Sequence, residues 1–143
     1  MARGFRLAGL LRLRQIQQDQ AASDLAAARR RANDSAARER RAQGALSGIS
    51  TDVSDSTVLY AIAAARASSR SMLAELQEIE RTDREKATEA NAAFTAARAR
   101  SVGLEKLERR HIDGVDSADL RAEQAVLDEI ATRDWKPAEG LAL

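Results

Sequence analysis

Apolar and small residues recur along the first third of the chain with the seven-residue period of helices that pack against other helices. Two rows share this period: Leu7, Arg14, Ala21, Ala28, Ser35, Ala42 and Ile49 form one, and Leu11, Gln18, Leu25, Ala32, Glu39, Leu46 and Val53 form the other. The pattern predicts a helix over residues 5–49. Because polar residues interrupt both rows, we expect this helix to need a partner surface.

The next stretch of the chain favours a loop and then a new helix start. Residues 44–56 contain two glycines and several serine, threonine and aspartate residues, which compete with helical hydrogen bonding. Asp55 or Ser56 is placed to cap a short helix over residues 57–68, because its side chain can accept a hydrogen bond from the first helical turn. The sequence therefore predicts a turn between the first helix and this short helix.

The seven-residue period resumes after three nearby serines and runs almost to the end of the chain. Its two rows are Leu73, Glu80, Ala87, Phe94 and Ser101, and Leu76, Asp83, Ala90, Ala97 and Leu104. They predict a long helix over residues 71–133. Gly114 either interrupts this helix or is tolerated within it, and the Lys136-Pro137 pair ends helical structure.

Together these elements predict an all-α fold, a long antiparallel two-helix coiled coil that forms a helical hairpin with a short helix near the turn. Residues 1–134 are expected to form this single hairpin, and residues 135–143 a flexible tail. At 1.5 Å per residue, the two long helices measure about 67 Å and about 95 Å. Either the C-terminal helix extends beyond its partner, or the short helix lies beside the tip and lengthens the first arm.

Composition and charge favour a thin helical molecule with its two ends together. Only 3% of the 143 residues are aromatic, and alanine, which buries little area, supplies 31 of the hydrophobic positions. Residues 1–41 contain ten arginines and four acids, a net charge of +6, whereas residues 111–143 have a net charge of −5. An antiparallel hairpin brings opposite charges side by side in this way. We therefore expect the two ends of the chain to pair.

Few residues offer chemistry for catalysis or metal binding. The sequence has no cysteine, and its only histidine, His111, is interpreted as a half-exposed helix residue. There is no glycine-rich phosphate loop and no Ser, His, Asp set on a strand-supported site, so we expect no enzyme activity, no cofactor and no metal site. The arginine clusters at 29–31 and 38–41 lack aromatic neighbours for base stacking, so we do not expect nucleic acid as a partner.

The sequence also lacks the patterns of membrane and secretory segments. No stretch approaches the roughly 18 consecutive apolar residues of a membrane span. The apolar stretch 7–11 is cut off by Arg12 and Arg14, well below the length of a signal-peptide core. The absence of cysteine fits a reducing compartment. We therefore expect a soluble, cytoplasmic protein.

Two stretches near the ends of the chain stand out by their order and spacing. The first is Phe5-Arg6-Leu7 followed by Leu10-Leu11-Arg12-Leu13-Arg14. The second is Leu104-Glu105-Lys106-Leu107-Glu108-Arg109-Arg110, followed by Arg121, Glu123, Gln124 and Leu127-Asp128-Glu129. Each stretch alone is common among coiled coils, but together they are fairly specific, and they resemble the FliJ family of flagellar type III export proteins.

The resemblance implies an antiparallel hairpin similar to the rotor shaft of rotary ATPases, bound near the centre of the hexameric flagellar export ATPase. It further implies contacts with the cytoplasmic domain of the export gate and with substrate chaperones, and a place at the inner membrane held through these partners. The residues that it assigns to the ATPase contact are Leu10, Leu13, Arg14, Leu107, Arg121, Glu123, Gln124, Asp128 and Glu129. The candidates for the export-gate contact are Val58, Leu59, Tyr60 and Ile62.

Two features depart from the family pattern. Gly114 and neighbouring short acids stand where continuous helix formers are expected. Trp135 is also unexpected, and it either forms an exposed contact or folds back on the first helix near Phe5.

Two other functions stay open, a structural coiled-coil spacer and a secreted helical-hairpin effector. The second is disfavoured because its characteristic Trp-x-Gly turn is absent.

Overall fold

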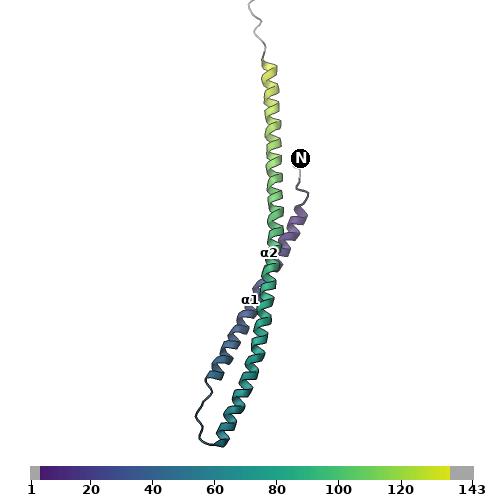
Figure 1. Cartoon of the computed structure of the whole chain (residues 1–143). Helices are drawn as coiled ribbons and strands as arrows, with labels where there is room; N and C mark the ends of the chain where they lie inside the picture. The colour runs from purple at the N-terminus through teal and green to yellow at the C-terminus, as the bar shows by residue number, and fades with distance from the viewer. Residues whose placement is uncertain (1–3, 136–143) are drawn as a thin grey trace, which may run out of the picture.

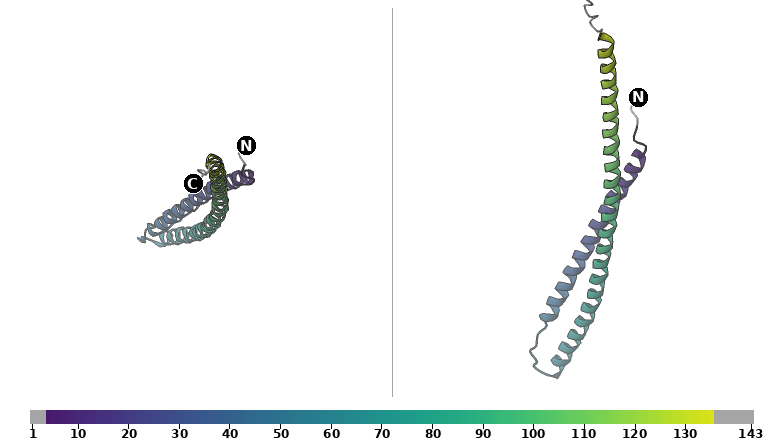
Figure 2. Two further views of the ribbon diagram at one scale, coloured as in Figure 1. Left: turned by 90° about the horizontal axis from the view of Figure 1, so that it is seen from above. Right: turned by 45° about the horizontal axis from the view of Figure 1, so that its top comes forward.

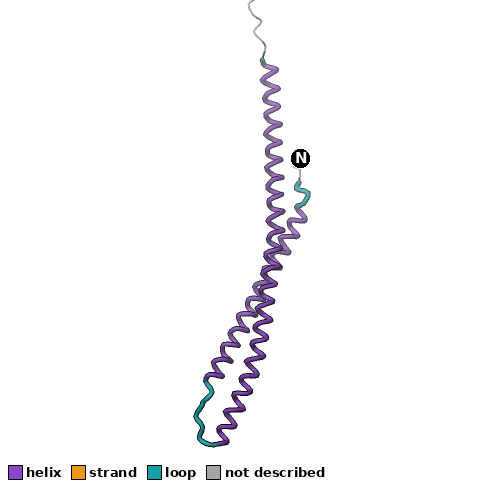
Figure 3. The backbone as a smooth tube through the Cα atoms, in the orientation of Figure 1, coloured by secondary structure: helices purple, strands orange, loops and turns teal. Residues whose placement is uncertain are grey.

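The computed structural model describes residues 4–135, which form two long antiparallel α-helices (Figure 1). α1 spans Ala8–Ser47 and α2 spans Ser56–Asp134, so the helices are about 60 Å and about 118 Å long at 1.5 Å per residue. A loop of residues 48–55 joins them at one end (Figure 3). The described residues contain no strand. The predicted all-α helical hairpin is confirmed.

The heptad rows of the sequence form the seam between the two helices. The buried residues are Leu11, Leu25, Ala28 and Ser35 of α1 and Leu73, Ala97 and Ser101 of α2, and all seven belong to the predicted rows. Most other row positions are half-buried. Because many of these side chains are alanine or serine, the helix backbones can approach closely where they meet.

α1 crosses α2 obliquely, and the two helices separate toward the loop (Figures 1 and 2). No residue of α1 after Ser35 is buried, and none of α2 before Leu73. The buried part of the seam therefore runs from Leu11 to Ser35 of α1 and from Leu73 to Ser101 of α2.

Both ends of the loop are capped by hydrogen bonds. The backbone N–H of Gly48 donates to the carbonyl of Gly44 at 2.9 Å at the end of α1. At the start of α2, Oδ1 of Asp55 accepts from the backbone N–H of Val58 at 2.9 Å. Asp55, one of the two capping residues predicted from the sequence, is thus the N-cap of α2.

The prediction of a separate short helix over residues 57–68 is wrong. α2 begins at Ser56 and continues through Ser68, Ser69 and Ser71 without a break. Serine costs only about 0.5 kcal/mol relative to alanine in a helix, and the flanking residues are mainly good helix formers. α2 also continues through Gly114, so this glycine is tolerated within the helix.

Three contacts show how far the N-terminal part of the chain reaches along α2. The hydroxyl of Ser35 donates to Oδ2 of Asp83, and Nη2 of Arg29 donates to Oδ1 of Asn91 at 3.3 Å. Nearer the N-terminus, the ring of Phe5 lies 5.6 Å from the ring of His111, between centroids. The start of α1 therefore lies beside α2 near residue 111.

Residues 116–134 of α2, called the terminal segment here, extend beyond α1 by about 28 Å at 1.5 Å per residue (Figure 1). All its residues are exposed. The prediction that the two ends of the chain pair is therefore wrong, and the alternative of an overhanging C-terminal helix is correct. With only 40 residues α1 cannot span a 79-residue partner, and exposed opposite charges are too weak to shift the register.

Trp135 directly follows α2, and His111 lies within that helix. Trp135 is 71% exposed at the far end of the terminal segment, whereas Phe5 lies against His111, so Trp135 does not fold back onto Phe5. His111 is half-buried in α2, as the sequence interpretation expected. The predicted tail, apart from Trp135, lies outside the described residues.

Candidate protein-interaction surface

Exposed large apolar side chains concentrate where α1 begins and α2 continues alone. They are Leu7, Leu10, Leu13 and Ile16 at the start of α1, and Leu107, Ile112, Leu120, Val126, Leu127, Ile130 and Trp135 in the last part of α2. Toward the turn, the corresponding residues are fewer: Val53, Leu59, Tyr60, Met72 and Ile79. Exposed apolar side chains that gather on one region indicate a binding surface.

The terminal segment of α2 has an apolar stripe of its own. Leu120 and Leu127 lie seven residues apart, and Val126 and Ile130 lie four apart on the neighbouring side. At about 100° per residue, the centre of this stripe is rotated by about 80° from the last seam positions of α2, Ala97, Ser101 and Leu104. Those rows continue into the segment only as small or polar residues, namely Ala118, Ala122, Ala125, Glu129 and Thr132. The stripe therefore does not extend the hairpin seam.

The terminal segment is also strongly acidic. It contains six acids and two arginines, a net charge of −4. Asp116, Asp119, Glu123 and Asp134 lie among the apolar residues of the stripe, which gives one helix face both leucines and carboxylates. A partner for this face needs apolar side chains flanked by basic residues.

A second group of exposed leucines lies beside the start of α1. Leu10 and Leu107 lie on the same side of the hairpin, each rotated by about 70° to 90° from the seam of its own helix. Leu13 follows Leu10 on the same flank of α1. All three are exposed, whereas Leu11 next to them is buried in the seam. This side therefore presents leucines from both helices.

The structure separates the residues assigned to the ATPase contact into two groups. Leu10, Leu13, Arg14 and Leu107 lie where α1 and α2 run together. Arg121, Glu123, Gln124, Asp128 and Glu129 lie on the terminal segment, where α2 is alone. The two groups therefore form successive levels of one rod instead of a paired end.

Within the terminal segment these polar residues do not share one face. Nε2 of Gln124 donates to Oδ1 of Asp128 at 3.1 Å, and Arg121 lies on the same side one turn earlier. Glu123 lies within the apolar stripe. Glu129 lies on the continuation of the rows that face α1 nearer the turn. Arg14, in contrast, is half-buried, and its Nη1 donates to Oε1 of Gln17 at 3.0 Å.

The four candidates for the export-gate contact occupy the first turns of α2, next to the loop. Leu59 and Tyr60 are 50% and 75% exposed. Val58 and Ile62 are half-buried and lie on the side toward α1. Only Leu59 and Tyr60 therefore offer large exposed surfaces to a partner at this end.

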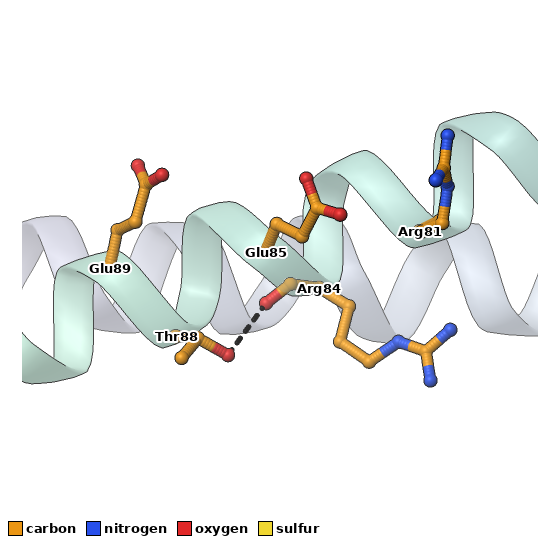
Figure 4. A pocket seen from close by; sticks show the side chains of 5 residues that line it. All are labelled: Arg81, Arg84, Glu85, Thr88 and Glu89. Atoms are coloured by element: carbon orange, nitrogen blue, oxygen red, sulfur yellow. Dashed lines mark hydrogen bonds between the residues drawn. The ribbon is translucent and has the colours of Figure 1, made fainter.

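The middle of α2 carries a balanced set of charges on its outer face (Figure 4). Arg81, Glu85 and Glu89 project to one side of the helix, while Thr88 Oγ1 donates to the carbonyl of Arg84 at 3.1 Å. Glu78, which accepts a hydrogen bond from Arg81 Nη2 at 2.5 Å, raises the pKa of Arg81 above its ordinary value, with a smaller contribution from Glu85. Intrahelical charge pairs of this kind are typical of a solvated helix face.

Sequence reasoning missed the apolar stripe formed by Leu120, Val126 and Ile130 as a distinct surface. The signal was present, because these residues do not fall in the seven-residue rows that begin at Leu73 and Leu76. A change of phase in a heptad pattern indicates that the helix turns a different face to a different partner.

Neither a metal site nor a membrane span is found among the described residues. Between residues 4 and 135, no group of three or more His, Asp or Glu side chains is placed to hold a metal ion. No helix in this part of the chain combines the length and the apolar character needed to cross a membrane. Among known proteins, no family model, curated protein or solved structure matches the chain.

Proposed function

We propose that this chain is a non-enzymatic component of the flagellar type III protein export apparatus, which binds the export ATPase as a rotor-shaft-like hairpin. The observation that carries the proposal is the single-helix extension of α2, which presents the Arg121, Gln124 and Asp128 row beyond a two-helix shaft. A hexameric ring with a narrow central channel suits a partner that tapers from two helices to one. The short stretches that resemble the FliJ family lie on this tapering end.

In this proposal the two ends of the hairpin have different partners. The tapering end binds the ATPase through Leu10, Leu13 and Leu107 at one level and through the terminal segment at the next. The turn end, with Leu59 and Tyr60 exposed, contacts the cytoplasmic domain of the export gate. The roughly 118 Å of α2 then separates the two contacts, which suits a coupling role at the cytoplasmic face of the inner membrane. Substrate chaperones are a third class of partner in this role.

The test is to mix the purified chain with a flagellar export ATPase and measure binding and the rate of ATP hydrolysis. We expect binding and a changed rate. The double variant Leu10→Glu, Leu13→Glu should reduce binding at least about tenfold, because apolar contact residues that become charged lose their burial and cost desolvation. Both leucines are exposed, so the hairpin seam is not altered.

Leu59→Glu is the matched control, because it introduces the same charge at an exposed leucine on the opposite end of the molecule. It should bind the ATPase as the unchanged chain does. Absence of both binding and any change in hydrolysis rate would leave a structural spacer as the better description.

A further inference from the structure

We infer that the terminal segment docks onto a second copy of this chain, so that two hairpins join head to head in a two-fold dimer. The occupant of the apolar stripe is then the side of the second hairpin that carries Leu10, Leu13 and Leu107. The head of the hairpin is defined here as residues 4–26 with residues 97–115. This inference goes beyond the proposed function and does not depend on it. Because the dimer covers the same leucines as the proposed ATPase contact, the dimer and the ATPase-bound chain are alternative states.

The stripe has the spacing of a surface that packs on another helix, and the monomer supplies no such helix. Leu120, Leu127 and Ile130 follow the alternating spacing of a coiled-coil seam, and Leu127 is 59% exposed. The N-terminal end of α1 does not reach the terminal segment, and α1 packs on a different side of α2. Exposed leucines at this spacing gain stability when another helix covers them.

The two surfaces are also complementary in charge. The terminal segment has a net charge of −4, whereas the head contains eight basic and five acidic residues, a net charge of +3. Arg6, Arg100 and Arg110 lie on the same side of the head as Leu10 and Leu107, by the helical rotation of about 100° per residue. Leucines flanked by arginines therefore meet leucines flanked by carboxylates.

Charge also decides which part of the second copy is contacted. Two terminal segments that packed directly on each other would bring together two surfaces of net charge −4, which is unfavourable. Packing of each segment on the other copy's head removes this repulsion and covers both groups of exposed leucines. The two-fold arrangement repeats the contact, so that it is made twice.

The length of the terminal segment fixes how much of the other copy it covers. Its 19 residues span about 28 Å and therefore reach along residues 8–26 of α1. When the segment of one copy runs along residues 8–26 of the other, Leu120 lies near the level of Leu13 and Leu107. Glu123 then lies level with Gly103 of the second copy. The contact region becomes a three-helix bundle on each side of the axis.

The chain's lack of cysteine makes this register directly testable by disulfide trapping. A Gly103→Cys chain and a Glu123→Cys chain are mixed and oxidised, and the mixed disulfide is measured by mass spectrometry. Gly103 is open, since an added Cβ meets nothing within 4 Å. The two positions in one chain are about 30 Å apart along a single helix, too far for a disulfide. A mixed product therefore requires two chains.

The expected result is a mixed Gly103→Cys, Glu123→Cys disulfide, formed in preference to the pair of Ser71→Cys with Glu123→Cys. Ser71 is exposed on α2 about 48 Å from Gly103 and serves as the remote control. Trapping of the remote pair at an equal or greater level would overturn the inference.

Sedimentation equilibrium of the unchanged chain supplies the second measurement. A monomer–dimer equilibrium with a dissociation constant in the micromolar range is expected, weakened by added salt because the contact joins opposite charges. Leu127→Glu should weaken dimerisation at least about tenfold, whereas Met72→Glu, at a similarly exposed apolar side chain nearer the turn, should not. A chain that stays monomeric up to about 100 μM, or one whose dimer survives Leu127→Glu, would show the inference to be wrong.

Discussion

At the scale of single residues, two buried serines in the seam have opposite hydrogen-bonding environments. Ser35 is buried, and its hydroxyl donates to the carboxylate of Asp83 on the other helix. Ser101 is 0% exposed, and its Oγ has no hydrogen-bond partner. A buried polar group without a partner costs free energy, whereas a satisfied one contributes modestly. The two serines therefore affect stability with opposite sign.

Ser101→Ala should raise the free energy of unfolding by about 1 kcal/mol, because it removes an unsatisfied buried hydroxyl and leaves a small side chain of high helix propensity. Ser35→Ala should lower it by about 1 kcal/mol, because Asp83 loses its donor inside the seam. Urea titration followed by far-ultraviolet circular dichroism measures both. If both variants lost stability equally, Ser101 would have to be making a favourable hydrogen bond.

At the scale of helices, the sequence predicts the elements well because each rests on a local signal. The two heptad rows define the seam, and the side chain of Asp55 caps α2. The false boundary at Ser68–Ser71 arises because three serines weaken a helix without ending it. Alanine and arginine on either side are favourable enough to carry α2 through. The residue types alone do not show whether these small helix-propensity free energies sum to a continuous helix or to a break.

Gly114 offers a test of how stable the single-helix part of α2 is. Gly114→Ala should stabilise the helix there by about 1 kcal/mol, because the added Cβ meets nothing within 4 Å. Amide hydrogen exchange should then slow in residues 110–130 and stay unchanged near the turn. Gly48→Ala is the contrasting variant, since its Cβ would lie 3.3 Å from the Gly44 carbonyl oxygen, so no comparable gain is expected. Unchanged exchange around Gly114 would contradict the prediction.

At the scale of the whole molecule, the register of the hairpin is the feature that the sequence leaves undetermined. Alanine-rich rows fit their partner almost equally well after a shift by one heptad, because one alanine replaces another. Charge at the ends then favours paired termini, but specific contacts such as Ser35 with Asp83 and Phe5 with His111 define a different register. The sequence therefore places the predicted ATPase-contact residues at one paired end, whereas in the structure they occupy two levels of a tapering rod.

The tapering shape indicates that the paired part of the hairpin, and not the terminal segment, stabilises the fold. Ending the chain at Val115 removes the terminal segment, whose described residues are all exposed. At a protein concentration well below the dissociation constant of the inferred dimer, we expect the shortened hairpin to unfold at the same urea concentration as the full chain, because the buried residues of the seam all remain. Helix content should fall in proportion to the helical residues removed, as far-ultraviolet circular dichroism can measure.

Removal of residues 1–26 is the informative contrast to that truncation. It deletes Leu11 and Leu25 and uncovers Ala97 and Ser101, so it should lower stability strongly although it removes a similar number of residues. A chain ending at Val115 that was also much less stable would mean that the terminal segment supports the seam. If it keeps full stability but neither dimerises nor affects the ATPase, the shaft and the binding surface are physically separable parts of one helix.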